Sequence, residues 1–309
     1  EKLAPYRPLV VVWDYFFPDE RDEFDDHFAR GAGALEAPVV VGAFFDVNGQ
    51  PRLSPTIREA VHGAGSLAGR DPGEFSRQFE IPVAVRRGFE SPIPGLAVAA
   101  FAAARFPECA VDVVLHDRHA ELRYRKRRPK PNEPRWLEST DIVPVAETRR
   151  VRSDVDLFGW QLPLLQSADQ VHVMAVSADP RYWQAIDIVN YEDLFTGDER
   201  SLRSRLSGRA VVIGQMIPPQ DRYLTRNGEE IYGCQVHAAA LDQLLVTGLP
   251  QTFAWKDLVW RTLIWSFGAG LAVSLLRPPR RVGLGVQAAL CTLVLVVSVG
   301  TALYISVRV

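Results

Sequence analysis

Three aspartates that follow apolar runs are the strongest candidates for a polar binding site. Asp14 lies near the end of a run that starts at Pro8, Asp46 closes a run that starts at Pro38, and Asp221 follows a third run by six residues. Ligands of open α/β sheets bind beyond the carboxyl ends of strands, so neighbouring parallel strands would bring these carboxylates to one rim. Such a rim would accept a polar or cationic ligand. Alternatively, each aspartate caps a turn or the start of a helix.

The sequence lacks the motifs of common catalytic and metal sites. It contains no GxSxG, SxxK or HExxH motif and no P-loop. His116 and His119 form an isolated HxxH beside Asp117, and a surface turn explains this better than a zinc site. We therefore predict no catalytic residue, no metal and no cofactor. Cys109 and Cys234 could pair in an oxidising compartment, but their spacing says nothing about geometry.

Composition excludes several classes of protein. The 309 residues are 47% hydrophobic and 23% charged, which argues against a disordered or fibrous chain. The formal net charge of −2 gives no overall electrostatic case for binding nucleic acid. The length allows about two domains.

Two apolar segments at the C-terminal end have the length of membrane spans. Residues 258–276 contain one charge, Arg261, and at 1.5 Å per residue they reach roughly 28 Å, close to the hydrocarbon thickness of a bilayer. Residues 282–307 form a second, uncharged run. We therefore predict two transmembrane helices in residues 256–309, although a buried helical hairpin is the alternative.

The charges between the two spans predict their orientation. Arg277, Arg280 and Arg281 lie in this short loop, and the positive-inside rule places it in the cytoplasm. Residues 1–255 are then expected to be extracytoplasmic. The repeat of Ser266, Gly270 and Ser274 would allow a homodimer through the first span. Because the chain starts at Glu1 without a signal peptide, we expect further residues upstream.

The extracytoplasmic region reads as an α/β domain. Continuous apolar, β-branched runs predict strands buried on both faces, and alanine-rich or amphipathic segments between them predict helices. The expected fold is a mixed or mainly parallel sheet flanked by helices. The strands are predicted within residues 8–17, 38–46 and 209–215, the helices within 19–35, 92–106 and 235–247, and a short helical turn within 191–195.

Two charged segments stand apart from this pattern. Residues 123–135 carry seven basic residues and three prolines, which predicts an exposed loop that is either simply solvated or in contact with anionic lipid headgroups or an acidic ligand. Residues 19–26 carry six carboxylates in eight positions. They are most simply a helix N-terminus, where the dipole favours negative charge; metal binding is the weaker alternative, because the run lacks EF-hand spacing.

The order of several short motifs resembles that of the CHASE2 sensor domain of bacterial membrane receptors. VVVWDYFFPDE at residues 10–20 is similar to that family's strand, aspartate and aromatic turn, and residues 22–45 resemble the helix and strand that follow. Residues 62–66, 71–83 and 190–194 match weaker elements. The strongest similarity lies in LSGRAVVIGQ at 206–215, Asp221, and IYGCQVHAAALDQLL at 231–245.

This resemblance implies a non-catalytic sensor. An extracytoplasmic domain would bind an unknown small-molecule or envelope signal and relay it through membrane helices to a cytoplasmic output domain. The relay element we expect is the last helix of the domain, residues 237–247, because a short link joins it to the first span. The alternatives are a membrane-tethered extracytoplasmic enzyme and a structural subunit of an envelope complex.

Overall fold

A computed structural model describes residues 2–15, 22–45, 50–67, 78–86, 91–150, 170–177, 186–216, 222–224 and 230–246. The chain divides into two compact units, Glu1–Leu249 and Pro250–Val309, and all of the described residues belong to the first. The predicted spans at 258–276 and 282–307 lie outside the described residues. Within the described part, no helix is both long and apolar enough to cross a membrane.

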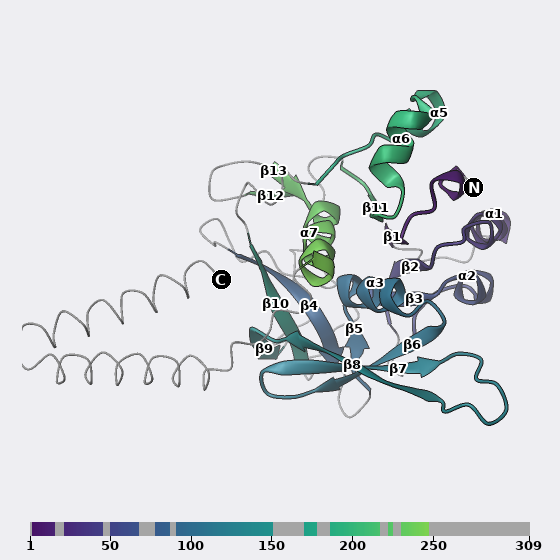
Figure 1. Ribbon diagram of the computed structural model, residues 1–309. Helices are drawn as coiled ribbons and strands as arrows, with labels where there is room; N and C mark the ends of the chain where they lie inside the picture. Colours follow the sequence, from purple (N-terminus) through teal and green to yellow (C-terminus); the bar gives the residue numbers. More distant parts are fainter. Residues whose placement is uncertain are drawn as a thin grey trace, which may run out of the picture. The chain divides into compact units, whose positions relative to one another are not determined.

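A parallel four-stranded sheet forms the centre of the first unit (Figure 1). Its strand order is β11-β1-β2-β3, and every neighbouring pair is parallel. The three predicted strands are therefore confirmed, and they are neighbours in one sheet. Their bounds are β1 Val10–Asp14, β2 Val39–Ala43, β3 Gly63–Ser66 and β11 Ala210–Gly214.

Helices cover both faces of this sheet, which explains the continuous apolar runs. Val10, Val12 and Val40 belong to the core that α3 and α7 complete, whereas Val11 and Val39 belong to a second core beneath α1, α2 and α6. Successive strand residues thus alternate between two apolar layers. The helices are α1 Asp22–Gly33, α2 Pro55–Ala60, α3 Leu96–Arg105, α6 Glu199–Leu206 and α7 Gly233–Val246.

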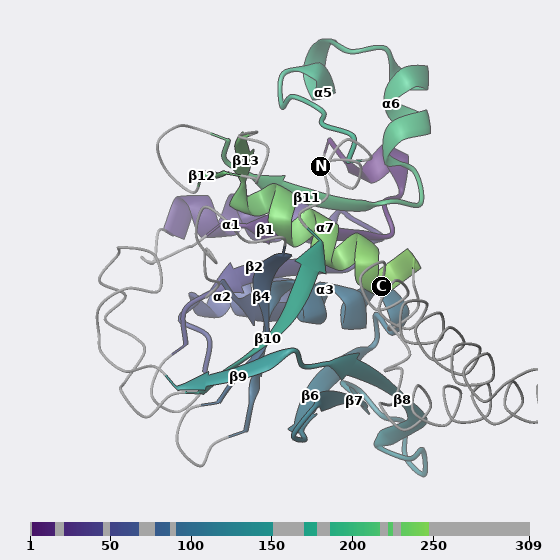
Figure 2. The same cartoon turned by 90° about the vertical axis from the view of Figure 1, so that its left-hand side faces the viewer.

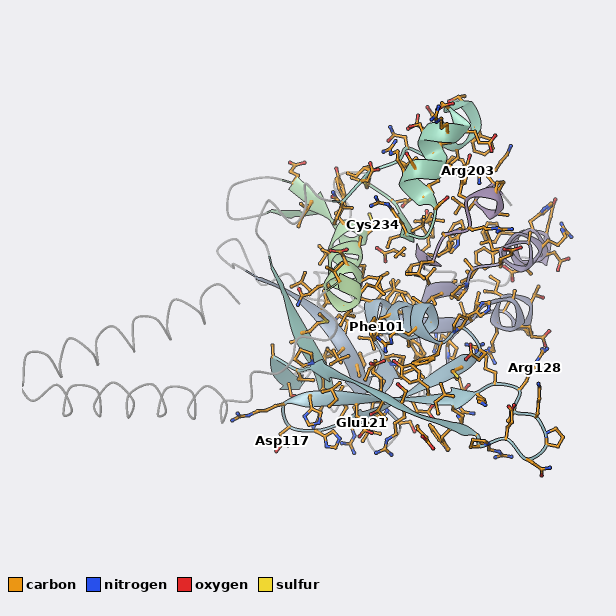
Figure 3. The ribbon with its side chains drawn as sticks, in the orientation of Figure 1. Phe101, Asp117, Glu121, Arg128, Arg203 and Cys234 are labelled. Atoms are coloured by element: carbon orange, nitrogen blue, oxygen red, sulfur yellow. The ribbon has the colours of Figure 1, made fainter. Side chains whose placement is uncertain are left out.

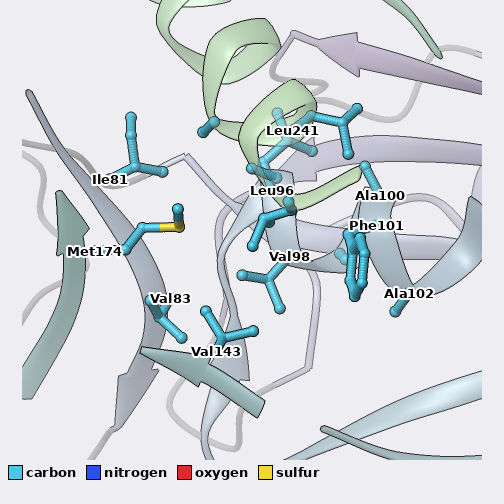
Figure 4. Packing of buried hydrophobic residues seen from close by; sticks show 14 of the residues in the cluster. Ile81, Val83, Leu96, Val98, Ala100, Phe101, Ala102, Val143, Met174 and Leu241 are labelled. Atoms are coloured by element: carbon cyan, nitrogen blue, oxygen red, sulfur yellow. The ribbon is translucent and has the colours of Figure 1, made fainter. Parts of the chain in front are cut away.

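The helix α3 is buried on nearly all sides, and Figure 4 shows it packing against α7 and the strands. Alanine at most of its positions lets these elements approach closely. The predicted helix began at Pro92, which is wrong by four residues because Ile93–Pro94 forms the short strand β5. Gly95 starts the helix with no room for a side chain, since a Cβ there would lie 1.8 Å from the Pro82 carbonyl oxygen.

Antiparallel sheets make up the rest of the described fold and were not predicted as such. One sheet has the order β5-β4-β10-β9 and another the order β6-β7-β8, and β12 and β13 form a separate small pair next to α7. These strands are β4 Gln78–Arg86, β6 Cys109–Leu115, β7 His119–Lys126, β8 Trp136–Pro144, β9 Glu147–Arg150, β10 Gln170–Ser177, β12 Arg222–Leu224 and β13 Glu230–Tyr232. The remaining short elements are the 3-10 turn η1 Ala4–Tyr6 and the helix α5 Asp193–Thr196.

The basic segment at 123–135 differs from its prediction in one respect. Residues 127–135 do form the loop between β7 and β8, but residues 123–126 belong to β7. Arg123 and Arg125 lie on the exposed face of that strand, and Tyr124 between them is buried. Half-exposed strands tolerate charge at every second position, so charge density alone did not exclude a strand.

Candidate functional site

The central sheet has a topological switch point between β1 and β11: β2 and β3 are added on one side of β1, and β11 is added on the other. The chain leaves β1 for α1, which covers one face, and after β11 it reaches α7, which covers the other face. Figure 2 shows α7 lying alongside β11 and β1. Strand ends at such a switch point are splayed apart by their diverging connections and are the usual ligand sites of open α/β sheets. Asp14 is the last residue of β1 and pairs in register with Gly214, the last of β11.

Asp14 faces a histidine from α7 at this point. Its Oδ1 lies 3.9 Å from Nε2 of His237, and the two side chains are only 9% and 8% exposed. Burial raises the pKa of Asp14 above its ordinary value, and the nearby His237 opposes that rise. His237 Nδ1 is buried and has no hydrogen-bond partner among the described residues. A buried acid and a partly unsatisfied base therefore meet at the carboxyl edge of the sheet.

Close packing fixes the helix that carries His237. A Cβ placed on Gly214 would lie 2.3 Å from Cβ of Cys234, in the first turn of α7, so only glycine fits there. The backbone N–H of Tyr232 donates to Oε1 of Gln235 at 2.9 Å, which satisfies a donor at the start of the helix. The end of β11 thus holds α7 at a defined height above Asp14. Cys234 and Cys109 are both buried, and no disulfide joins them.

The structure places one of the three predicted aspartates. Asp14 lies at the strand end as expected, whereas Asp46 and Asp221 lie outside the described residues. His237 was not predicted as a site residue. The sequence did contain a sign of this role. His237 lies within the apolar helix sequence QVHAAALDQLL, and a polar ring buried on such a helix needs a polar partner inside the fold.

The HxxH pair does not form a metal centre in the described structure. His116 and His119 flank the turn between β6 and β7, and the backbone N–H of His116 donates to the carbonyl of His119 at 2.9 Å. Their rings stack with centroids 4.4 Å apart. The described residues contain no group of three His, Cys, Asp or Glu side chains arranged to hold a metal ion. The predicted surface turn is confirmed.

A second polar cluster, around the buried side chains of Tyr124 and Asp141, ties α3 to the β6-β7-β8 sheet. The Tyr124 hydroxyl donates to Oδ2 of Asp141 at 2.5 Å, and Nε of Arg105 lies 3.3 Å from the same oxygen. Arg105 also lies over the rings of Phe101 and Phe106. Tyr124 belongs to β7 and Arg105 to α3, so these contacts join two packed elements and do not line the carboxyl edge of the parallel sheet. This cluster therefore stabilises the fold.

Together these features describe a layered α/β domain with a buried polar pair at the switch point of its parallel sheet. The family model of the CHASE2 domain matches residues 1–275, and the chain belongs to this family. A CHASE2 domain is an extracytoplasmic sensor domain and is typically non-catalytic. No curated protein and no solved structure matches the chain.

Proposed function

We propose that this chain is the sensing part of a bacterial membrane receptor, with residues 1–255 on the extracytoplasmic side of the inner membrane. Membership of the CHASE2 family supports this proposal, as do the apolar runs 258–276 and 282–307 with their arginine loop. In this arrangement the domain receives a small-molecule or envelope stimulus. The membrane helices relay it to a cytoplasmic output domain.

The signal site of the proposal is the pair of Asp14 and His237. The observation that carries it is that a carboxylate and an imidazole, both more than nine-tenths buried, face each other at 3.9 Å where the sheet changes direction. This separation exceeds a hydrogen bond, so a ligand that donates to Asp14 and accepts from His237 gains contacts that the two side chains do not make with each other. Asp46 and Asp221 follow neighbouring strands in sequence and would supply further carboxylates to the same rim.

The relay of the proposal runs through α7. His237 lies on this helix, and the chain passes from its end at Val246 towards the first predicted span. A ligand that changes the distance between Asp14 and His237 favours one position of α7 over another. A stimulus biases the receptor only through its different affinities for those two states.

Topology is the first test. In cells producing the full chain, the variant Lys130→Cys, at an exposed position, should react with an impermeant maleimide from outside. The variant Arg280→Cys should react only after lysis. The native Cys109 and Cys234 are buried, and the third cysteine, Cys291, is replaced by serine in both variants, so the background is low. Protection of Lys130→Cys with labelling of Arg280→Cys in intact cells would overturn the proposed orientation.

The second test addresses the signal site. In the receptor with its own output domain, Asp14→Asn and His237→Leu should each alter the output that the native envelope stimulus produces. Asp141→Asn is the matched control, since the side chains of Asp141 and Asp14 are both 9% exposed and Asp141 lies outside the switch point. Responses of both site variants equal to the wild type would remove Asp14 and His237 from the sensing mechanism.

A further inference from the structure

The loop between β7 and β8 carries a concentrated positive charge at its end. Arg128, Lys130 and Arg135 are exposed, and no ion pair joins them to another described residue. Trp136 follows directly and is 44% exposed. These four residues are called the cationic tip.

The loop holds the cationic tip in a fixed position. Glu133 accepts a hydrogen bond from Nζ of Lys126 at 3.2 Å and another from the backbone N–H of Lys130 at 3.4 Å. Asn132 adopts a left-handed conformation with φ of 73°, and three prolines lie in the same loop. The exposed cations are therefore presented on a pre-ordered scaffold, which lowers the entropic cost of binding.

An exposed surface of opposite character lies on α1. Glu23 and Asp26 are exposed one helical turn apart, with no ion pair to a described residue, and Phe24 beside them is 47% exposed. Phe24 stacks on Phe28 with ring centroids 6.4 Å apart, which holds its ring at the surface. These three exposed residues, Glu23, Phe24 and Asp26, are called the anionic helix face.

We propose that the cationic tip of one copy of this chain docks on the anionic helix face of a second copy. Each surface combines exposed charges that form no ion pair with a described residue and one large, partly exposed aromatic ring, and the two charges are opposite. Arg128 in the β7-β8 loop and the helix α1 lie along the same side of the domain (Figures 1 and 3). A twofold axis therefore allows both contacts to form reciprocally in one dimer.

The overall charge of the chain is compatible with this contact. A net charge of −2 over 309 residues leaves little general repulsion between copies, so the local patches decide the interaction. Exposed charges are screened over about 10 Å at 0.1 M salt and about 3 Å at 1 M, so the contact weakens as salt rises. This inference does not depend on the proposed signal site.

The test uses two differently tagged full-length copies in nanodiscs, each with Cys291→Ser. One copy carries Pro131→Cys near the cationic tip, and the other carries His27→Cys beside the anionic helix face. A bismaleimide should cross-link them. Reversing the tip with Arg128→Glu, Lys130→Glu and Arg135→Glu should lower the yield roughly fivefold or more. Arg118→Glu, at the opposite turn of the same sheet, is the matched control and should leave the yield unchanged.

Rescue distinguishes a lost contact between copies from misfolding of the reversed tip. Glu23→Lys and Asp26→Lys in the partner copy should restore cross-linking to the reversed tip. A yield that the reversed tip does not lower would overturn the proposal. So would a yield that falls without rescue and rises with phosphatidylglycerol in the nanodisc, because the tip would then bind anionic lipid instead. If the copies dimerise only through their membrane helices, the dimer will still form, but reversing the charges of the tip will not change the cross-linking yield.

Discussion

Cys234 occupies the space above Gly214 where any other residue would place its side chain. The Cβ of an alanine at this position would lie 2.3 Å from Cβ of Cys234 and 3.1 Å from its sulfur. The contact joins the end of β11 to the first turn of α7, one helical turn before His237. Because Gly214 has no Cβ, α7 packs closer to the end of β11 than any larger residue would allow.

Replacing Gly214 with alanine should displace α7 and destabilise the domain by about 1–3 kcal/mol, because the neighbouring atoms are backbone-anchored. Chemical denaturation of the full chain in detergent measures this change. Gly33→Ala is the control, since a Cβ there meets nothing within 4 Å. Equal stability of Gly214→Ala and wild type would show that α7 adjusts without strain.

Asp14→Asn should make the domain relatively more stable as the pH rises. Burial raises the folded-state pKa of Asp14 above 3.8, so its contribution to stability is present below 3.8 and lost as the pH rises through the folded value. Asparagine cannot ionise and avoids this loss. Denaturation of both proteins at pH 3 to about 8 should show a difference that grows with pH. Asp26→Asn, at an exposed position, is the reference for removing a surface carboxylate.

His62 should weaken the fold in mild acid. Val39 N–H donates to Nδ1 of His62 at 3.2 Å, which requires a neutral ring nitrogen. Burial, with a smaller effect of Arg127, lowers the pKa of His62 below 6.5. Its stabilising contribution is present above pH 6.5 and is lost as the pH falls through the folded value. His62→Gln, which keeps an acceptor, should flatten the loss of stability that chemical denaturation measures below pH 6.5.

Tyr124→Phe should cost about 1.5–3 kcal/mol of folding free energy. The change removes a 2.5 Å hydrogen bond to Asp141, which is 8% exposed and keeps only Arg105 as a described partner. The urea midpoint of the full chain reports this loss. Tyr191→Phe, at a residue that is 72% exposed, is the control. A loss below about 0.5 kcal/mol would mean that Arg105 alone satisfies Asp141.

The parallel sheet was predictable because burial on both faces leaves an unmistakable pattern. Val10–Asp14, Val39–Ala43 and Ala210–Gly214 each lie within a predicted run, and α1 and α7 end within a few residues of their predicted bounds. The helix α6 was missed because only Leu202 and Leu206 of its eight residues are buried. Two apolar positions are too few to establish a helical period.

The antiparallel strands and the site residue His237 could not be predicted from local sequence patterns. In β7, Ala120, Leu122 and Tyr124 alternate with charged residues, yet the density of arginine suggested a loop. At the site, Asp14 was found from its position after an apolar run. Its partner His237 comes from the other end of the domain, and only the sheet order brings the two together.

The pairing of β1 with β11 also has a consequence for synthesis. Val10 pairs in register with Ala210, so about two hundred residues must emerge from the ribosome before the first strand gains its second neighbour. Until then β1 presents an unprotected apolar edge, which is prone to join strands of other nascent chains. A chaperone that shields β1 until β11 has been synthesised would therefore raise the yield of native protein more than one acting on the completed chain.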